Sequence, residues 1–125
     1  MRHLELGGYG EKLALDYFKN QDFLIKERNF RKKWGEIDIV AYDKKTKETV
    51  FIEVKTRLRD GSLAIDPEEE LTTKKIQRLK RIILSYLSLK RLENQPWRFD
   101  FVAIELKDFQ SKPIIRHYKD EFLEF

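Results

Sequence analysis

Two short runs of alternating apolar and polar residues constrain the fold of this chain more than any other feature of its sequence. They span residues 35–40 and 50–55, and a polar segment, residues 43–48, lies between them. Such alternation is typical of a β-strand with one buried face, and a short polar connection favours a hairpin. We therefore expect two neighbouring strands whose buried face carries Ile37, Ile39, Ala41, Ile52 and Val54.

The opposite face of these strands carries Glu36, Asp38, Glu53 and Lys55. If the strands pair, Asp38, Glu53 and Lys55 meet on one surface. Converging carboxylates repel each other unless a cation lies between them, and oxygen ligands suit Mg²⁺ or Mn²⁺. A nearby ammonium can orient water or offset charge on a phosphate, so the pattern predicts metal-assisted phosphodiester hydrolysis. The alternative is a solvated strand face, which is common in a chain with 38% charged residues.

Several short motifs follow one another along the chain with a specific order and spacing. They are Gly10-Glu11, Asn29, Gly35-Glu36-Ile37-Asp38, residues 51–57, Lys75 and Arg98-Phe99-Asp100. On these motifs the sequence resembles the YraN-like family of small bacterial proteins, from about residue 6 to residue 104. That family is related to archaeal Holliday-junction resolvases and has the restriction-endonuclease-like, PD-(D/E)xK fold. The sequence departs from the nuclease motif at Ile37, which stands where the motif has proline.

The resemblance implies roles for four side chains. Asp38 and Glu53 are implied as metal ligands, Lys55 as the catalytic lysine and Glu11 as a helix-borne acid. The residues alone leave Glu11 with two interpretations, in which it faces the metal site or is a boundary residue whose carboxylate reaches solvent. The family resemblance favours the first. Glu11 shares the apolar stripe of the first expected helix, residues 4–19, with Leu4, Ala14, Leu15 and Phe18.

The length of 125 residues predicts a single domain, residues 1–125, and the family resemblance implies that this domain is nuclease-like. The order of the elements predicts an α/β fold with a mixed central sheet flanked by helices, and the resemblance implies a restriction-endonuclease-like αβββαβ core. The absence of cysteine excludes disulfides and thiolate chemistry, and no apolar run approaches a membrane span. A cytoplasmic protein without a membrane partner is therefore expected. The remaining elements are a strand at 23–30, a long helix from Pro67, and strands at 97–106 and 114–118.

Basic residues indicate a polyanionic partner. From Leu71 to Leu92 there are seven Lys or Arg residues and no acid, and this unrelieved charge repels itself unless a partner such as a phosphate backbone binds. The usual alternative is a solvated helix face. The candidate nucleic-acid contacts are Lys74, Arg78 and Arg81 on that helix, Lys75 at the position of the family's helix-borne lysine, Arg57 in an expected loop at 56–63, and the corner Lys33-Trp34.

Three features of the sequence have more than one interpretation: Trp34, Asp100 and the C-terminal tail. Trp34 either stacks on a base or packs on the edge of the sheet while its basic neighbours are solvated. Asp100 matches the family but is expected to be structural, pairing with Arg98 or a helix end, so it is left out of the metal shell. The apolar tail, residues 122–125, either packs back on the domain or joins a partner subunit, and a homodimer is one expectation.

The leading functional hypothesis is a Mg²⁺- or Mn²⁺-dependent endonuclease that hydrolyses DNA, at branched or repair and recombination intermediates. Asp38, Glu53 and the Val54 backbone carbonyl are expected to hold the metal, while Lys55 positions or activates water. Glu11 assists through a water or a second ion. The alternative hypothesis is a nucleic-acid-binding accessory module that does not cleave and serves a DNA repair or uptake assembly. A third is a structural protein in which the acidic cluster is incidental.

Overall fold

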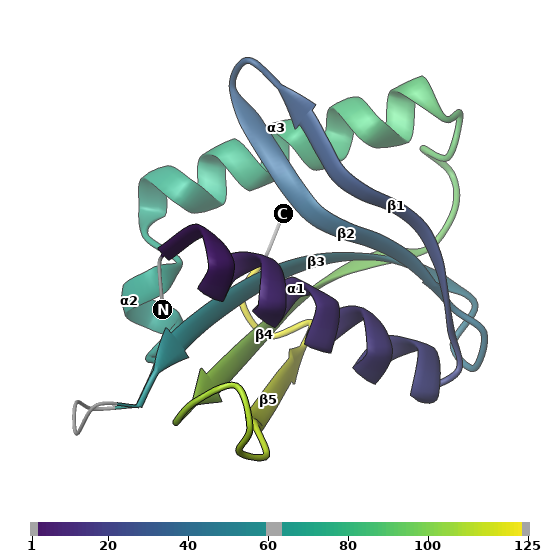
Figure 1. Cartoon of the computed structure of the whole chain (residues 1–125). Coiled ribbons are helices and arrows are strands. Elements are labelled where there is room, and N and C mark those ends of the chain that lie inside the picture. Colours follow the sequence, from purple (N-terminus) through teal and green to yellow (C-terminus); the bar gives the residue numbers. More distant parts are fainter. Residues whose placement is uncertain (1–2, 60–63, 124–125) are drawn as a thin grey trace.

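The computed structural model describes residues 3–59 and 64–123 and contains one five-stranded sheet with helices on both faces (Figure 1). The strands lie in the sheet in the order in which they occur in the sequence. The elements are α1 (His3–Asn20), β1 (Phe23–Lys32), β2 (Gly35–Asp43), β3 (Glu48–Leu58), α2 (Pro67–Glu70), α3 (Thr73–Leu89), β4 (Trp97–Leu106) and β5 (Ile114–Lys119).

The sheet is mixed. β1, β2 and β3 form an antiparallel meander, β4 pairs parallel to β3, and β5 pairs antiparallel to β4. A parallel pair needs a crossover connection, and the segment with α2 and α3 supplies it. The predicted α/β order of one helix, three strands, a helix and two strands is confirmed.

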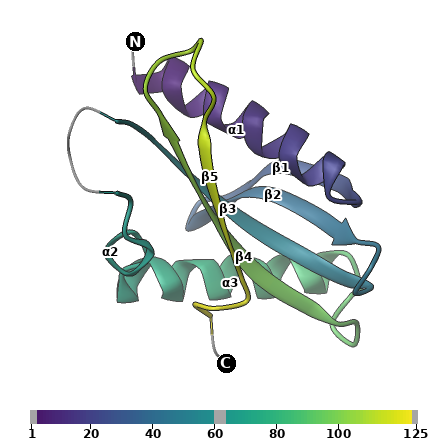
Figure 2. The same ribbon diagram turned by 90° about the horizontal axis from the view of Figure 1, so that it is seen from below.

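Both faces of the sheet are covered, because α1 packs on one face and α3 on the other (Figure 2). The centres of β2 and β3 are therefore buried on both sides, whereas the alternating pattern predicted one buried face. Ile39 and Ile52 contribute to the core beneath α1, while Val40 and Phe51 contribute to the core beneath α3. The alternation of buried and polar residues persists only towards the end of β2 and β3 that carries Asp38 and Glu53.

The predicted face of Ile37 is wrong. It packs in the core beneath α3 and not with Ile39 and Ala41 beneath α1. The reason is that β2 pairs with β3 only as far as Ile39 opposite Ile52, and continues beyond that point paired with β1 alone. The free hairpin bends towards α3 (Figure 1).

The bend of the β1–β2 hairpin has two visible causes in β1. The pairing register shifts between Ile25 and Glu27, and Asn29 has a left-handed φ of 52°. Both irregularities increase strand curvature. At the tip of the hairpin Gly35 lies next to α3, where a Cβ would make ordinary van der Waals contact with the Arg78 carbonyl oxygen at 3.5 Å.

The long helix expected from Pro67 is two helices. Pro67 is at the start of α2, as predicted, but α2 ends at Glu70 and α3 begins at Thr73. Leu71 leaves helical geometry with φ −96° and ψ 69°, which places its side chain in the core at 4% exposure. Thr72 then caps α3, since its hydroxyl accepts a hydrogen bond from the Lys75 amide at 3.2 Å.

Two further expectations concern the loop at 56–63 and the C-terminal tail. The expected loop at 56–63 begins later, because residues 56–58 still belong to β3 and Leu58 pairs with Leu106; residues 60–63 lie outside the described residues. The C-terminal tail packs back, as far as it is described, with Leu123 buried beside α3 and Phe122 against it. Residues 124 and 125 lie outside the described part.

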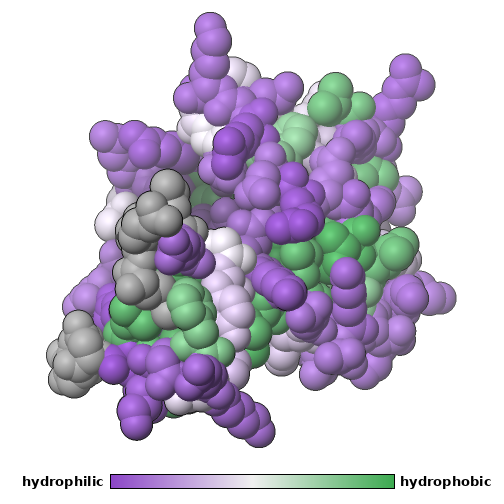
Figure 3. Space-filling view, in the orientation of Figure 1, coloured by the Kyte–Doolittle hydropathy of each residue, from purple (hydrophilic) through white to green (hydrophobic). Residues whose placement is uncertain are grey.

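The surface seen in Figure 3 is mainly hydrophilic, and hydrophobic side chains show only as separate patches between the polar ones. This agrees with a chain in which 38% of the residues are charged. None of the described helices is both long enough and apolar enough to cross a membrane.

Candidate active site

Asp38 and Glu53 meet where β2 and β3 separate. Both lie just beyond the last paired residues of the two strands, Ile39 and Ile52. Asp38 Oδ2 accepts a hydrogen bond of 2.8 Å from the Val54 amide, and the Asp38 and Glu53 carboxyl groups are close enough to shift each other's pKa. The predicted convergence of these two side chains is thus present, held by strand backbone and not by a flexible loop.

Two buried carboxyl groups this close repel each other when both are ionised, unless they share a proton or bind a cation. Burial, followed by the charge of Asp38, raises the pKa of the Glu53 carboxyl to about 8. Burial also raises the pKa of Asp38, although its bond from Val54 opposes the rise. Lys75 Nζ lies 3.6 Å from Glu53 Oε1 and favours the ionised form. The pair is therefore poised to exchange a proton for a cation near neutral pH.

A cleft of about 990 Å³ opens above this pair, between the tip of the β1–β2 hairpin and α3. Its acidic lining residues are Glu36, Asp38 and Glu53. Five basic residues also line it, and they are the ones that the sequence predicted on α3 and at the hairpin corner: Lys33, Lys74, Lys75, Arg78 and Arg81.

Trp34 forms one wall of the cleft. The Arg81 guanidinium lies 4.3 Å from the centre of the indole ring, a cation–π contact between the hairpin tip and α3. Trp34 Nε1 is buried and finds no hydrogen-bond partner among the described residues. Trp34 thus lies in the cleft and against α3, whereas the alternative interpretation placed it on the edge of the sheet.

A smaller cavity of about 220 Å³ lies on the α1 side of Asp38, so that Asp38 borders both spaces. Glu11, Val54 and Lys55 also line it. The Glu11 side chain is only 18% exposed, and its Oε1 lies 3.7 Å from Arg28. Burial, followed by the nearby charge of Asp38, raises the pKa of Glu11. Glu11 therefore lies close to Asp38 and is mostly buried, whereas its second interpretation placed its carboxylate in solvent.

The position of Glu11 depends on a close approach of α1 to β3 at Gly10. A Cβ on Gly10 would lie 1.8 Å from Thr56 Oγ1, so only glycine permits this distance. By contrast, a Cβ on Gly7 would meet nothing within 4 Å. The sequence indicated the Gly10-Glu11 pair through the family resemblance, but only the structure shows what Gly10 does.

Lys55 and Arg57 extend from the same face of β3 and meet a residue that the sequence analysis did not single out. Lys55 Nζ lies 3.8 Å from Glu70 Oε2, and Arg57 Nη2 lies 3.4 Å from Glu70 Oε1. Lys55 lines the smaller cavity, while Arg57 lines neither. Glu70 is the third residue in a run of glutamates that otherwise indicated only a helix start, so nothing in the sequence distinguished it from its neighbours.

The donor set of this site fits a hard divalent cation in part. Among the described residues, no group of three or more His, Cys, Asp or Glu side chains is arranged to hold a metal ion. Asp38 and Glu53 supply two carboxylates, and such a set suits Mg²⁺ or Mn²⁺, which commonly retain several waters. The second feature that fits is the raised pKa of both buried carboxyl groups, because a bound cation relieves the cost of ionising them side by side.

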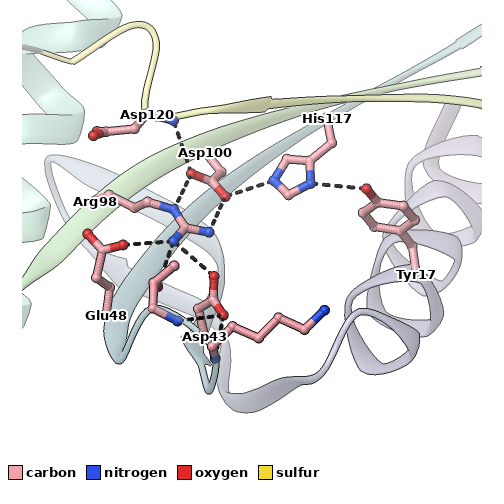
Figure 4. Close-up of polar contacts among 9 residues, drawn as sticks. Tyr17, Asp43, Glu48, Arg98, Asp100, His117 and Asp120 are labelled. Atoms are coloured by element: carbon pink, nitrogen blue, oxygen red, sulfur yellow. Dashed lines mark hydrogen bonds and ion pairs between the residues drawn. The ribbon is translucent and has the colours of Figure 1, made fainter.

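A second polar cluster lies at the other end of the sheet and is built around Arg98 and Asp100 (Figure 4). Arg98 donates to both oxygens of Asp100, at 3.0 and 3.2 Å, and its Nη1 lies 3.0 Å from Asp43 and 2.9 Å from Glu48. His117 Nε2 lies 2.7 Å from Asp100. Burial favours protonated Asp100, but hydrogen bonds from His117 and Arg98 outweigh burial and hold its pKa below the usual value.

This cluster is structural. Asp100 is fully buried and Arg98 is 5% exposed, and both lie in β4 away from the two cavities that border Asp38. The expectation that Asp100 is structural and pairs with Arg98 agrees with these contacts. His117, which also reaches the Tyr17 hydroxyl at 3.1 Å through Nδ1, ties β5 to α1 and was not anticipated.

Known proteins resemble this chain over most of its length. It is 43% identical over 117 residues to a UPF0102 protein of Geotalea uraniireducens, covering 94% of this chain and 88% of the relative. It is 39% identical over 119 residues to a UPF0102 protein of Clostridium botulinum, covering 94% of both chains. Among solved structures, SfsA of Pyrococcus furiosus in complex with Ca²⁺ is 14% identical, with a TM-score of 0.36; the alignment covers 87% of this chain and 58% of SfsA.

The family model described as "Uncharacterised protein family UPF0102" matches residues 10–104. That span runs from Gly10 to Ile104 and so includes Glu11, Asp38, Glu53 and Lys55. The match and the two relatives show that this chain belongs to the UPF0102 family, the YraN-like proteins.

Proposed function

We propose that this protein is a Mg²⁺- or Mn²⁺-dependent endonuclease that hydrolyses phosphodiester bonds of DNA. The observation that carries the proposal is the buried Asp38–Glu53 pair in a cleft that five basic residues also line. Paired carboxylates suit a divalent cation, and clustered Lys and Arg residues suit a phosphate backbone. The restriction-endonuclease-like order of strands and helices is consistent with this chemistry.

Each residue of the site has a definite role in the proposal. Asp38, Glu53 and the Val54 backbone carbonyl hold the metal, which when bound polarises the phosphate and acidifies water. Lys55 orients the attacking water or offsets charge that grows on the phosphate. Glu11, on the other side of Asp38, accepts a hydrogen bond from water in the smaller cavity. Lys75, 3.6 Å from Glu53, offsets the carboxylate charge and contacts phosphate.

The cleft supports a nucleic-acid strand as substrate. Within residues 3–59 and 64–123, Lys74, Arg78 and Arg81 make no ion pair with an acidic side chain, so their charge is available to phosphates. Trp34 offers an aromatic face for a base once Arg81 shifts from it. Arg57 lies further along β3 and extends the cationic path beyond Lys55.

The proposal is tested by cleavage of labelled linear duplex, single strand, flap and four-way junction in Mg²⁺ or Mn²⁺. Wild type is compared with Glu53→Ala and Lys55→Ala, and Glu69→Gln serves as a matched control on exposed α2. We expect cutting that requires the metal and falls by about 100-fold or more in both site variants. The control is expected to cut like wild type. Equal cutting by Glu53→Ala and wild type contradicts the proposal.

A second function is favoured by one contact. Lys55 pairs with Glu70 and not with the carboxylate pair, an arrangement that also suits an accessory module that binds nucleic acid without cutting it. Salt-sensitive binding without cleavage in any metal, with affinity unchanged by Lys55→Ala, identifies that function instead.

A further inference from the structure

Lys55 and Arg57 both form ion pairs with one carboxylate, that of Glu70 in α2. They stand two residues apart on β3, so their side chains leave the same face of the strand. Both ion pairs go to Glu70, one to each oxygen, at 3.8 Å and 3.4 Å. Two cations thus converge on one anion at the end of β3 that extends past Glu53.

The turn that carries Glu70 is anchored on both sides. Ile65 and Leu71 flank α2 and are 3% and 4% exposed in the core beneath α3. The Ile65 amide also donates to Glu105 Oε1 at 3.3 Å, which ties the segment to β4. Glu70 therefore reaches the two cations from a defined position, although its side chain remains 21% exposed.

The chemistry of this pocket matches a phosphate as well as a carboxylate. Both groups present neighbouring oxygens that accept charge-assisted hydrogen bonds, and Arg binds either in a fork geometry. The Glu70 carboxylate thus occupies a position that two cations contact, one at each of its oxygens. Surface ion pairs of this kind are individually weak, so an anion with higher charge can replace the carboxylate.

We propose that Lys55 and Arg57 form a phosphate-binding site whose resting occupant is the Glu70 carboxylate, and that a substrate phosphate binds by displacing it. The inference deepens the proposed function, since the phosphate is then one near the cleaved bond. Glu70 acts as a built-in competitor that keeps weakly charged anions out of the site. The opposing interpretation is that Glu70 is a permanent partner that merely holds both cations in place.

The test is a titration of the metal-free protein with inorganic phosphate, followed by NMR of the Arg57 guanidinium Nε–H and the Lys55 amide. Wild type is compared with Glu70→Gln, and Glu69→Gln removes the same charge from an exposed position of α2. We expect the Glu70→Gln midpoint to fall about fivefold, as expected from the loss of two partly exposed ion pairs. The Glu69→Gln midpoint is expected to stay within about twofold of wild type.

Three results overturn the inference: an unchanged midpoint in Glu70→Gln, a weaker affinity in that variant, or phosphate-induced shifts confined to α3. A double variant, Lys55→Gln with Arg57→Gln, is expected to show no phosphate-induced shift of the backbone amides of residues 55 and 57, and a retained shift at these amides also contradicts the site. The titration needs no metal and no cleavage. A protein that passes it but cuts no DNA refutes the proposed nuclease function while leaving the phosphate site in place.

Discussion

Replacing Glu53 with glutamine is expected to stabilise the metal-free protein, and more so as the pH rises. Glu53 is 13% exposed and its carboxyl faces that of Asp38. Its folded-state pKa of about 8 exceeds its ordinary value of 4.5, so the folded protein holds this proton more tightly than the unfolded chain does. The contribution of Glu53 to stability is therefore intact below about pH 4.5 and lost as the pH rises towards about 8.

The magnitude follows from the size of the shift. One pKa unit corresponds to about 1.4 kcal/mol, so the rise from 4.5 to about 8 bounds the loss at roughly 5 kcal/mol. Asp38 shares the proton, and Lys75 relieves part of the repulsion, so we expect a gain of about 2 kcal/mol for Glu53→Gln above about pH 8. For a chain of this size that is on the order of 5–10 °C in Tm.

The assay is urea unfolding followed by circular dichroism in EDTA, across the range from about pH 4.5 to about pH 9. Glu36→Gln is the control, because Glu36 lies on the same strand as Asp38 but is exposed and paired with Arg31 at 3.1 Å. The stability difference between Glu53→Gln and wild type should grow with pH, while Glu36→Gln tracks wild type. A Glu53→Gln protein that is less stable than wild type above about pH 8, or a control that gains equally, refutes the reasoning.

Two further predictions concern packing and the second polar cluster. Gly10→Ala is expected to destabilise the protein by about 1–3 kcal/mol, because its Cβ would meet Thr56 Oγ1 at 1.8 Å; Gly7→Ala, with open space, is expected to be neutral or stabilising in thermal unfolding. Arg98→Met should cost about 3–5 kcal/mol in urea unfolding near neutral pH, because it leaves Asp100 buried and charged without its main partner. Since the pKa of Asp100 is lowered, its stabilising contribution should fade as the pH drops below about 4, and equal acid profiles for variant and wild type contradict this.

Local pattern was sufficient for most elements of the fold. The two alternating runs predicted the β2–β3 hairpin, and β4 begins and ends at the predicted residues, Trp97 and Leu106. These segments are regular, so the two-residue period carries directly into the strand. The same periodicity predicted that the Asp38 and Glu53 side chains lie close together, because they belong to the two strands of one hairpin.

Features that depend on distant contacts were not available to that reasoning. The break at Leu71 arises because its side chain enters the core, and nothing in its local propensity forbids a continuous helix. Ile37 changes face because the hairpin bends after its pairing with β3 ends. In both cases tertiary packing overrides a local pattern.

In the functional site, too, local pattern identifies some residues, while others are identified only by tertiary contacts. Glu70 stands among identical neighbours, and only the folded chain brings its carboxylate to Lys55. The role of Gly10 likewise depends on Thr56, which is far away in sequence. Spacing in the sequence identifies residues on one element or one hairpin, while contacts between α1, α2 and β3 require the structure.

The central claim is that Asp38 and Glu53 form a divalent-cation site, and the most direct measurement is a calorimetric titration with Mn²⁺. Wild type, Asp38→Asn and Glu36→Gln are compared at one pH near neutrality. The account predicts that wild type and Glu36→Gln bind Mn²⁺ alike and release protons on binding, while Asp38→Asn loses most of the signal. A Mn²⁺ isotherm that is unchanged in Asp38→Asn contradicts the claim.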